Sequence, residues 1–445
     1  MIFVIGALLI AMALFGTPLF VVLAGLALVS FYLSDTGIVV LSEEHYKLAT
    51  NPHLLTIPMF TLAGFLMAES RAADRLVQAS RAWLGWCPGG LAIVVVASCA
   101  FFTTFTGASG VTIVALGGLL YPIMIQERYP QSFSLGLITA SGSIGLLFPP
   151  ALPLILYGIV AEVSIEEELF VAGWMPGLLM MGVLAVYCVR VGFKYKIRRT
   201  SFDLGVGLKT LWAAKWELLV PVVVLGSING LPDVLAPWVG EGAVAGLVTV
   251  AESSVICATY LLFIEVIIYK DIKLWPSKGD GDEVVTLPKV IRESTVMVGA
   301  ILIILGVALG LTNFLVQEQV PMKLLALIQE HIESRFTFLI MLTIFLLIVG
   351  CLMDIFSAII VVVPLITPIA MQYGVDPTHL GIIFLANLEI GYITPPVGLN
   401  LFISSLTFDK PVVELYKMSL PFLLLLLGAL MVITFWSPLS LYFLR

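Results

Sequence analysis

Two short stretches of the sequence combine glycine, polar residues and a Pro-Pro pair in the same order. They are Ser-Gly-Ser-Ile-Gly-Leu-Leu-Phe-Pro-Pro at 141–150 and Asn-Leu-Glu-Ile-Gly-Tyr-Ile-Thr-Pro-Pro at 387–396. Proline lacks an amide hydrogen and clashes with the preceding turn, so a helix opens there and leaves carbonyls unpaired. Such carbonyls can bind a small cation, and the amides at facing half-helix N-termini can bind a carboxylate. The pattern predicts a joint cation and anion site, whereas simple kinks in packed helices are the alternative.

Polar side chains within and beside these stretches are the candidate ligands. Asp354 and Glu389 lie in otherwise apolar segments, where an ionised group is costly unless it is paired. We therefore predict a function for both, although a helix-end carboxylate that reaches water or a neighbouring amide would also explain either one. Asn400 can present its amide to a carboxylate or an ion, or make a packing hydrogen bond. The predicted substrate contacts are four side chains: Ser143, Asn387, Glu389 and Asn400.

The elements that hold these residues are predicted to be helices in a lipid bilayer. Of the 445 residues, 60% are hydrophobic and 11% are charged, whereas soluble domains carry about 25% charged residues. Apolar runs such as 2–33, 169–191 and 418–441 reach the roughly 20 residues that a helix needs to cross the hydrocarbon. The sequence lacks the alternating segments of a β-barrel. The predicted fold class is an all-α polytopic membrane protein.

Several function classes are excluded by what the sequence lacks. It contains no Walker A motif, HExxH or GxSxG, and therefore no phosphate loop for ATP and no hydrolase nucleophile of these types. A net charge of −7 gives no general basic field for nucleic acid. The five cysteines form no CxxC pair that would indicate a zinc site. We predict no enzyme activity and no cofactor.

Two stretches near the breaks, about 89–125 and 336–371, are apolar but interrupted midway by small or polar residues. Each fits either two short spans or a re-entrant hairpin that enters and leaves on one side. If both are hairpins, the predicted cytoplasmic loops and span ends hold all 22 Lys and Arg residues except Lys47, Lys323, Arg335 and Arg445. This distribution satisfies the positive-inside rule, so it favours hairpins and a cytoplasmic N-terminus.

The two halves of the chain match at one constant shift. Gly391 lies over Gly145, which gives 391 − 145 = 246, and both Pro-Pro pairs agree with this shift. The predicted first repeat is 1–191 with a broken helix at about 132–160, and the second is 243–445 with a broken helix at about 378–406. Residues 192–242 form a connector with a basic loop and one span. Because the charges give the halves opposite orientations, we predict an inverted-topology repeat, which is typical of secondary transporters.

The motifs resemble the large membrane subunit of tripartite ATP-independent periplasmic (TRAP) transporters, which belong to the ion transporter superfamily. The resemblance rests on Thr-Gly-Ala-Ser-Gly at 106–110, on Gly-Leu-Leu-Phe-Pro-Pro at 145–150, and above all on the run 387–402. It covers nearly the whole chain. It implies an elevator-type carrier, in which two hairpins and two broken helices move against a scaffold.

The resemblance also implies the function and the partners. Such subunits sit in the bacterial inner membrane with a small four-helix membrane subunit and a periplasmic substrate-binding protein, and they use the Na⁺ gradient to import carboxylates. By the family pattern, Na⁺ would bind where each hairpin tip meets its broken helix. The residues that this implies are Thr106, Gly107, Ser109, Gly145 and Pro149 for one site and Asp354, Gly391, Thr394 and Pro395 for the other.

The sequence departs from the family pattern at an apparent insertion around 231–245, which puts the standard docking of partners in doubt. The main alternative function is a stand-alone Na⁺/organic anion symporter that needs no binding protein. An ion channel is a further alternative. The identity of the substrate and the number of Na⁺ ions are not encoded in these motifs.

Overall fold

The structure, a computed structural model, is helical in the parts of the chain that it describes, apart from one isolated bridge between Lys273 and Thr286. Seven of the described helices are long and apolar enough to cross a membrane, or up to nine if two bent helix pairs each count as one span. This confirms the predicted all-α polytopic class. The residues described are 19–33, 43, 46, 50, 52–197, 203–229, 248–276, 284–319, 323, 332, 334–395 and 398–444.

The first part of the described chain contains a pair of helices, a broken helix and a long helix, in that order, after three leading helices. The elements are α2 (Leu19–Leu33), η1 (Pro52–Leu55), α4 (Thr56–Glu69), α5 (Ala72–Leu84), α6 (Gly90–Thr106), α7 (Ser109–Gln126), α8 (Gln131–Ser141), η2 (Ile144–Leu147), α9 (Leu152–Ala161), η3 (Ile165–Leu169) and α10 (Phe170–Lys194).

The second part repeats this order after a connector. The connector consists of α11 (Leu204–Ala213), α12 (Lys215–Leu218) and α13 (Val220–Asn229). The predicted insertion at 231–245 lies outside the described residues. The elements that follow are α15 (Val250–Leu262), η6 (Phe263–Ile268), α16 (Leu287–Gln317), α18 (Arg335–Leu352), α19 (Ile355–Gln372), α20 (Pro377–Gly391), α21 (Leu399–Phe408), α22 (Val412–Phe435), α23 (Pro438–Leu441) and η7 (Tyr442–Leu444).

Helix boundaries recur at the shift found in the sequence. Moving α7 by 246 positions takes its bounds to 355–372, which are those of α19. The same shift takes α6 to 336–352, one residue inside the start of α18. Both predicted breaks are present, because α8 and α9 are bent by 46° across η2, and α20 and α21 are separate helices. Whether the two repeats face opposite sides of the membrane stays a prediction.

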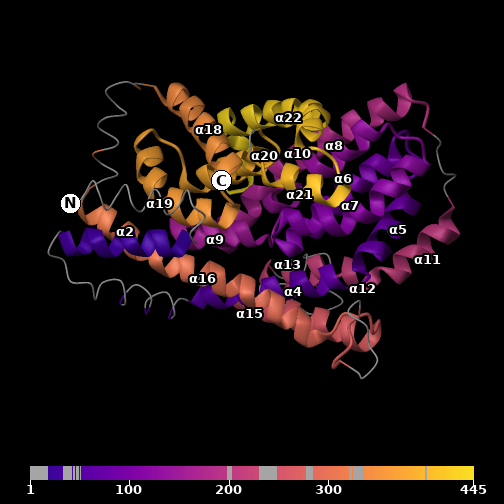
Figure 1. The fold of residues 1–445 in the computed structure, drawn as a ribbon, viewed down its shortest axis with the longest axis horizontal. Coiled ribbons are helices and arrows are strands. Elements are labelled where there is room, and N and C mark those ends of the chain that lie inside the picture. Colours follow the sequence, from indigo (N-terminus) through magenta and orange to yellow (C-terminus); the bar gives the residue numbers. More distant parts are fainter. Residues whose placement is uncertain are drawn as a thin grey trace.

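The helices pack in two groups (Figure 1). In one group, α15 and α16 both pack on α4, and α16 also packs on α2; this group lies along the lower side of the view. In the other group, α8 packs on α22, α9 on α19, and α20 on α18. Helices α4 and α16 join the groups through contacts with α6 and α19. Both breaks therefore lie within the second group.

Candidate functional site

The first break is contacted by α6, the first helix of the pair that precedes it in the chain. α8 ends at Ser141, a single 3-10 turn follows, and the cis Pro149-Pro150 peptide leads into α9. Because the helix opens, carbonyls at its end lose their helical donors. Thr103 of α6 donates from Oγ1 to the Gly142 carbonyl at 2.8 Å, and Thr104 donates to the Gly145 carbonyl at 3.1 Å. Threonine hydroxyls of α6 thus bind carbonyls on both sides of the opening, although the Gly145 carbonyl also accepts from the Phe148 amide at 3.1 Å.

Both break glycines touch the backbone of a neighbouring helix. A Cβ atom added to Gly145 would lie 2.6 Å from the Thr104 nitrogen, and one added to Gly391 would lie 2.7 Å from the Gly350 carbonyl carbon. Thr104 and Gly350 are repeat equivalents, since 350 − 104 = 246. The repeat therefore extends from the sequence to a tertiary contact, in which the first helix of each pair lies directly against its own break.

At the second tip, Asp354 caps the start of α19. Its carboxylate accepts hydrogen bonds from the Ser357 amide at 3.0 Å and from the Ser357 hydroxyl at 2.5 Å, and its side chain is exposed. These are the contacts of a helix-end carboxylate that binds a neighbouring amide, which was the alternative explanation for Asp354. The next residue, Ile355, donates its amide to the Tyr392 hydroxyl at 2.6 Å, which ties the tip to the break. A capping carboxylate still has lone pairs for another ligand.

The two breaks meet each other through polar groups. Ser143 Oγ donates to the Glu389 carbonyl at 3.3 Å, and Asn400 Nδ2 donates to Ser143 Oγ at 3.3 Å and to the Thr139 carbonyl at 3.2 Å. Ser143 and Glu389 are repeat equivalents, since 389 − 143 = 246. The structure thus brings together Ser143, Glu389 and Asn400, three of the four predicted substrate contacts, where the repeats meet.

Several oxygens near this junction are buried without a hydrogen-bond donor among the described residues. They are Oδ1 of Asn387, Oδ1 of Asn400 and both carboxyl oxygens of Glu389. Asn387 uses its Nδ2 locally, on the Ile383 carbonyl at 2.7 Å. A buried acceptor without a donor is costly, and amide and carboxylate oxygens are the ligands that hard cations prefer. A cation would stabilise the ionised form of the Glu389 carboxyl group, whereas an anionic substrate would not.

The other predicted ligands have local roles in the structure. Thr394 donates to the Ile390 carbonyl at 2.9 Å, and Thr106 makes a long contact of 3.5 Å with the Ala108 carbonyl. Gly107 ends α6 in the left-handed conformation, with φ at 62°, and Ser109 is the buried first residue of α7. Pro149 lines an apolar cavity of about 200 Å³ beside Thr104, and Pro395 is exposed.

Sequence reasoning missed three groups at the site. Thr103 and Thr104 were visible only as polar interruptions, and Tyr392 lies inside the second break motif. A polar residue one helical turn from a predicted tip is the signal that could have identified the threonines. Nothing local indicated their carbonyl partners, which lie 39 and 41 residues further along the chain.

A second polar cluster, which the sequence did not reveal, lies away from the breaks. Arg75 of α5 pairs with Glu217, with Glu265 at 3.0 Å and with Asp271 at 2.7 Å, and its guanidinium lies 3.7 Å from the centre of the Tyr269 ring. The Glu217 and Glu265 side chains are fully buried. The cluster joins α5, which leads to the first helix pair, to the connector and to η6.

Known proteins are similar to this chain in sequence and in fold. The model of the DctM component of the tripartite ATP-independent periplasmic transporter matches residues 5–439. The chain is 33% identical, over 90% of its length and 86% of the relative, to the C4-dicarboxylate TRAP transporter large permease protein DctM of Pseudomonas aeruginosa. It is 31% identical, over 88% of its length and 58% of the relative, to the isethionate TRAP transporter permease protein DctMQ of Oleidesulfovibrio alaskensis.

A solved structure, that of the Alcanivorax borkumensis YdaH transporter, matches 89% of this chain and 87% of its own with a TM-score of 0.62 at 16% identity, which shows a shared fold. The sequence matches go further, because they cover nearly the whole chain at identities that establish a family. The family consists of transporter permeases, not of enzymes. The chain therefore belongs to the DctM family, the large permease component of TRAP transporters, and is a multi-pass membrane transport protein.

Proposed function

We propose that this chain is the large permease of a Na⁺-coupled, binding-protein-dependent importer of a small organic acid. The observation that carries the proposal is the junction of the two breaks, where Asn400 lies against Ser143 and its buried Oδ1 has no donor among the described residues. Na⁺ takes oxygen ligands, so its binding there would satisfy this oxygen. The names of the two relatives, which specify a C4-dicarboxylate and isethionate, support a small organic substrate.

The coupling follows from electrostatics. A bound cation and a carboxylate substrate attract each other in a low-dielectric site, so each would stabilise the binding of the other. Asn400 Nδ2 and Ser143 Oγ would donate to the anion in place of their present bonds to the Thr139 and Glu389 carbonyls. The cation therefore binds first in the proposed cycle, and substrate binding depends on it.

The proposed movement is that of an elevator. The pairs α6–α7 and α18–α19 would be re-entrant hairpins, and together with the broken helices they would move against a scaffold formed by α2, α4, α15 and α16. Two observations support this division. The scaffold helices pack on one another, and each hairpin is packed against its own break.

The proposed partners are a small membrane subunit and a periplasmic binding protein, at the bacterial inner membrane and with the N-terminus of this chain in the cytoplasm. The relative named DctMQ supports the small membrane subunit as a partner. This chain matches 58% of that relative, whose name adds a Q to that of DctM. The large share of basic residues in the predicted inner loops supports the orientation.

Uptake by reconstituted liposomes tests the proposed function. With this chain, its small subunit and candidate binding proteins, we expect accumulation of a C4-dicarboxylate or a related acid only under an inward Na⁺ gradient and only with a binding protein. Replacing Na⁺ by K⁺ is the control. Na⁺-driven uptake without a binding protein would instead establish a stand-alone symporter, and flux that merely dissipates the substrate gradient would indicate a channel.

Substitutions of Asp354 test whether its carboxylate is a ligand of the second Na⁺ site or only caps α19. Asparagine caps a helix as well as aspartate does, whereas alanine loses about 1 kcal/mol. We therefore expect Asp354→Asn to keep the thermal stability of the protein but to raise the Na⁺ concentration for half-maximal uptake about tenfold, or 1.4 kcal/mol. Unchanged Na⁺ dependence in Asp354→Asn, with lower stability in Asp354→Ala, would reduce Asp354 to a structural cap.

A further inference from the structure

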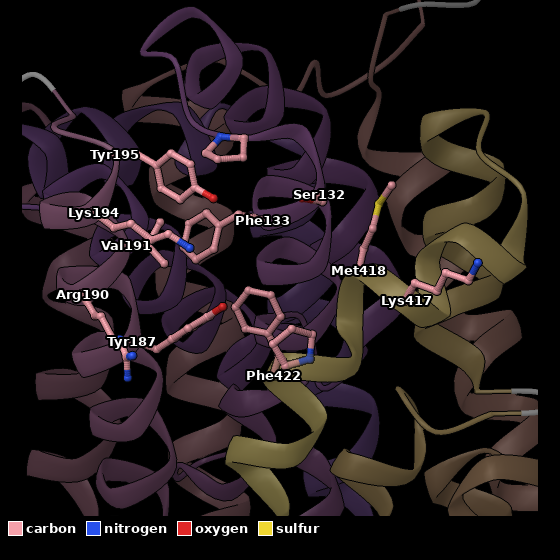
Figure 2. A pocket seen from close by; sticks show the side chains of 12 residues that line it. Ser132, Phe133, Tyr187, Arg190, Val191, Lys194, Tyr195, Lys417, Met418 and Phe422 are labelled. Carbon is pink, nitrogen blue, oxygen red and sulfur yellow. The ribbon is translucent and has the colours of Figure 1, made fainter.

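A cavity of about 520 Å³ lies at one end of the second helix group, away from the breaks (Figure 2). It opens between the first turn of α8, the last turns of α10 and the first turns of α22. All three helix ends belong to loops or span ends that the positive-inside rule assigns to the cytoplasm. The cavity therefore lies at the level of the inner membrane surface.

The charges around this cavity are all positive. Arg190 and Lys194 of α10 and Lys417 of α22 line it, and none of the residues that line it is acidic. All three side chains are exposed, and no ion pair joins them to a carboxylate in the part of the chain that the structure describes. Figure 2 shows Arg190 and Lys194 along one wall and Lys417 on the opposite side, with the Lys417 ammonium group turned away from the aromatic rings. Their long stems allow the charged ends to swing over the opening.

The floor of the cavity is aromatic. The rings of Phe133, Tyr187 and Phe422 contact one another in a triangle, with centroid separations of 5.8, 5.6 and 5.3 Å. Phe133 and Ser132 belong to the first turn of α8, whose amides have no side-chain cap. Such amides, together with the helix dipole, favour an anion. The cavity thus combines an apolar floor with positive groups at its rim.

We propose that this cavity binds a phosphate-bearing anion, and that its source is the headgroup of an anionic phospholipid in the cytoplasmic leaflet. A soluble phosphate would satisfy the three cations and the α8 amides but would leave the aromatic floor uncovered. A phospholipid satisfies both, because its phosphate meets the cations while its glycerol and upper acyl chains cover the rings. Basic pockets between helices on the cytoplasmic side have the chemistry that lipid headgroups require.

Native mass spectrometry of the purified chain in detergent tests this proposal, with phosphatidylglycerol, phosphatidylcholine and inorganic phosphate as probes. We expect one phosphatidylglycerol to be retained per chain in preference to phosphatidylcholine. The triple variant Arg190→Gln, Lys194→Gln, Lys417→Gln should bind it about 100-fold more weakly. The matched control Lys196→Gln, Lys209→Gln, Lys270→Gln removes three exposed cations outside the cavity and should bind normally.

The probes distinguish the sources of the phosphate. Millimolar inorganic phosphate that displaces the lipid from the wild type, but does not bind the triple variant, would keep the phosphate site and make its ligand soluble. Equal retention of both lipids, or equal loss of affinity in the two triple variants, would overturn the proposal. If the first triple variant does not fold, Lys417→Gln alone should weaken binding about fivefold, because one charge contributes about one third of the effect on a logarithmic scale.

Discussion

Gly145→Ala and Gly391→Ala are each expected to abolish substrate uptake and to lower the free energy of unfolding by about 3 kcal/mol. The reason is steric, because the new methyl group at Gly145 would lie 2.2 Å from the Ala100 carbonyl oxygen, and that at Gly391 would lie 2.7 Å from Gly350 atoms. Both obstacles are backbone, which cannot move aside without separating the helix pair from its break. Uptake into liposomes and thermal unfolding in detergent measure the two effects.

The matched control is Gly118→Ala in α7, which belongs to the same helix pair. A Cβ atom there meets nothing within 4 Å, and alanine favours a helix over glycine by about 1 kcal/mol. We expect Gly118→Ala to transport normally and to unfold at the same temperature or higher. Normal uptake in Gly145→Ala or Gly391→Ala would show that close contact between tip and break is not needed for transport.

Arg75→Gln is expected to destabilise the protein by about 3–5 kcal/mol and to prevent accumulation of folded protein in the membrane. The substitution would leave Glu217 and Glu265 without their cation although neither side chain reaches water. An unpaired buried carboxylate must either stay charged at high cost or take up a proton. The yield of folded, monodisperse protein and its unfolding temperature measure the effect.

Arg81→Gln, also in α5, is the control for the loss of one positive charge. Arg81 pairs with Glu127 at 2.6 Å, but its side chain is 38% exposed, so we expect a loss below about 1 kcal/mol. Adding Glu217→Gln and Glu265→Gln to Arg75→Gln should restore much of the stability, because the buried charges are then gone. An Arg75→Gln protein as stable as Arg81→Gln would mean that the cluster does not hold α5 to the connector.

The sequence by itself determined the class and the family, and it located the stretches in which several helices form. The predicted stretch 89–125 corresponds to α6 and α7, and the predicted breaks occur at the Gly and Pro-Pro motifs. These features are local, because the length of an apolar run decides whether a helix can cross a bilayer and a proline opens a helix wherever it occurs. The shift of 246 could be found in the sequence for the same reason, because each Gly and Pro-Pro motif is recognisable without knowledge of its tertiary contacts.

Only the tertiary structure decided which side chains meet. Arg75 pairs with Asp271, 196 residues away, and Asn400 reaches the Thr139 carbonyl across 261 residues. The positive-inside rule assigned Arg75 to the cytoplasmic side. For Asn400, the sequence left both a ligand role and a packing role open. A sequence pattern shows which face of a helix is apolar, but the partner of a buried polar group depends on how distant helices pack, and no local property of the chain encodes that choice.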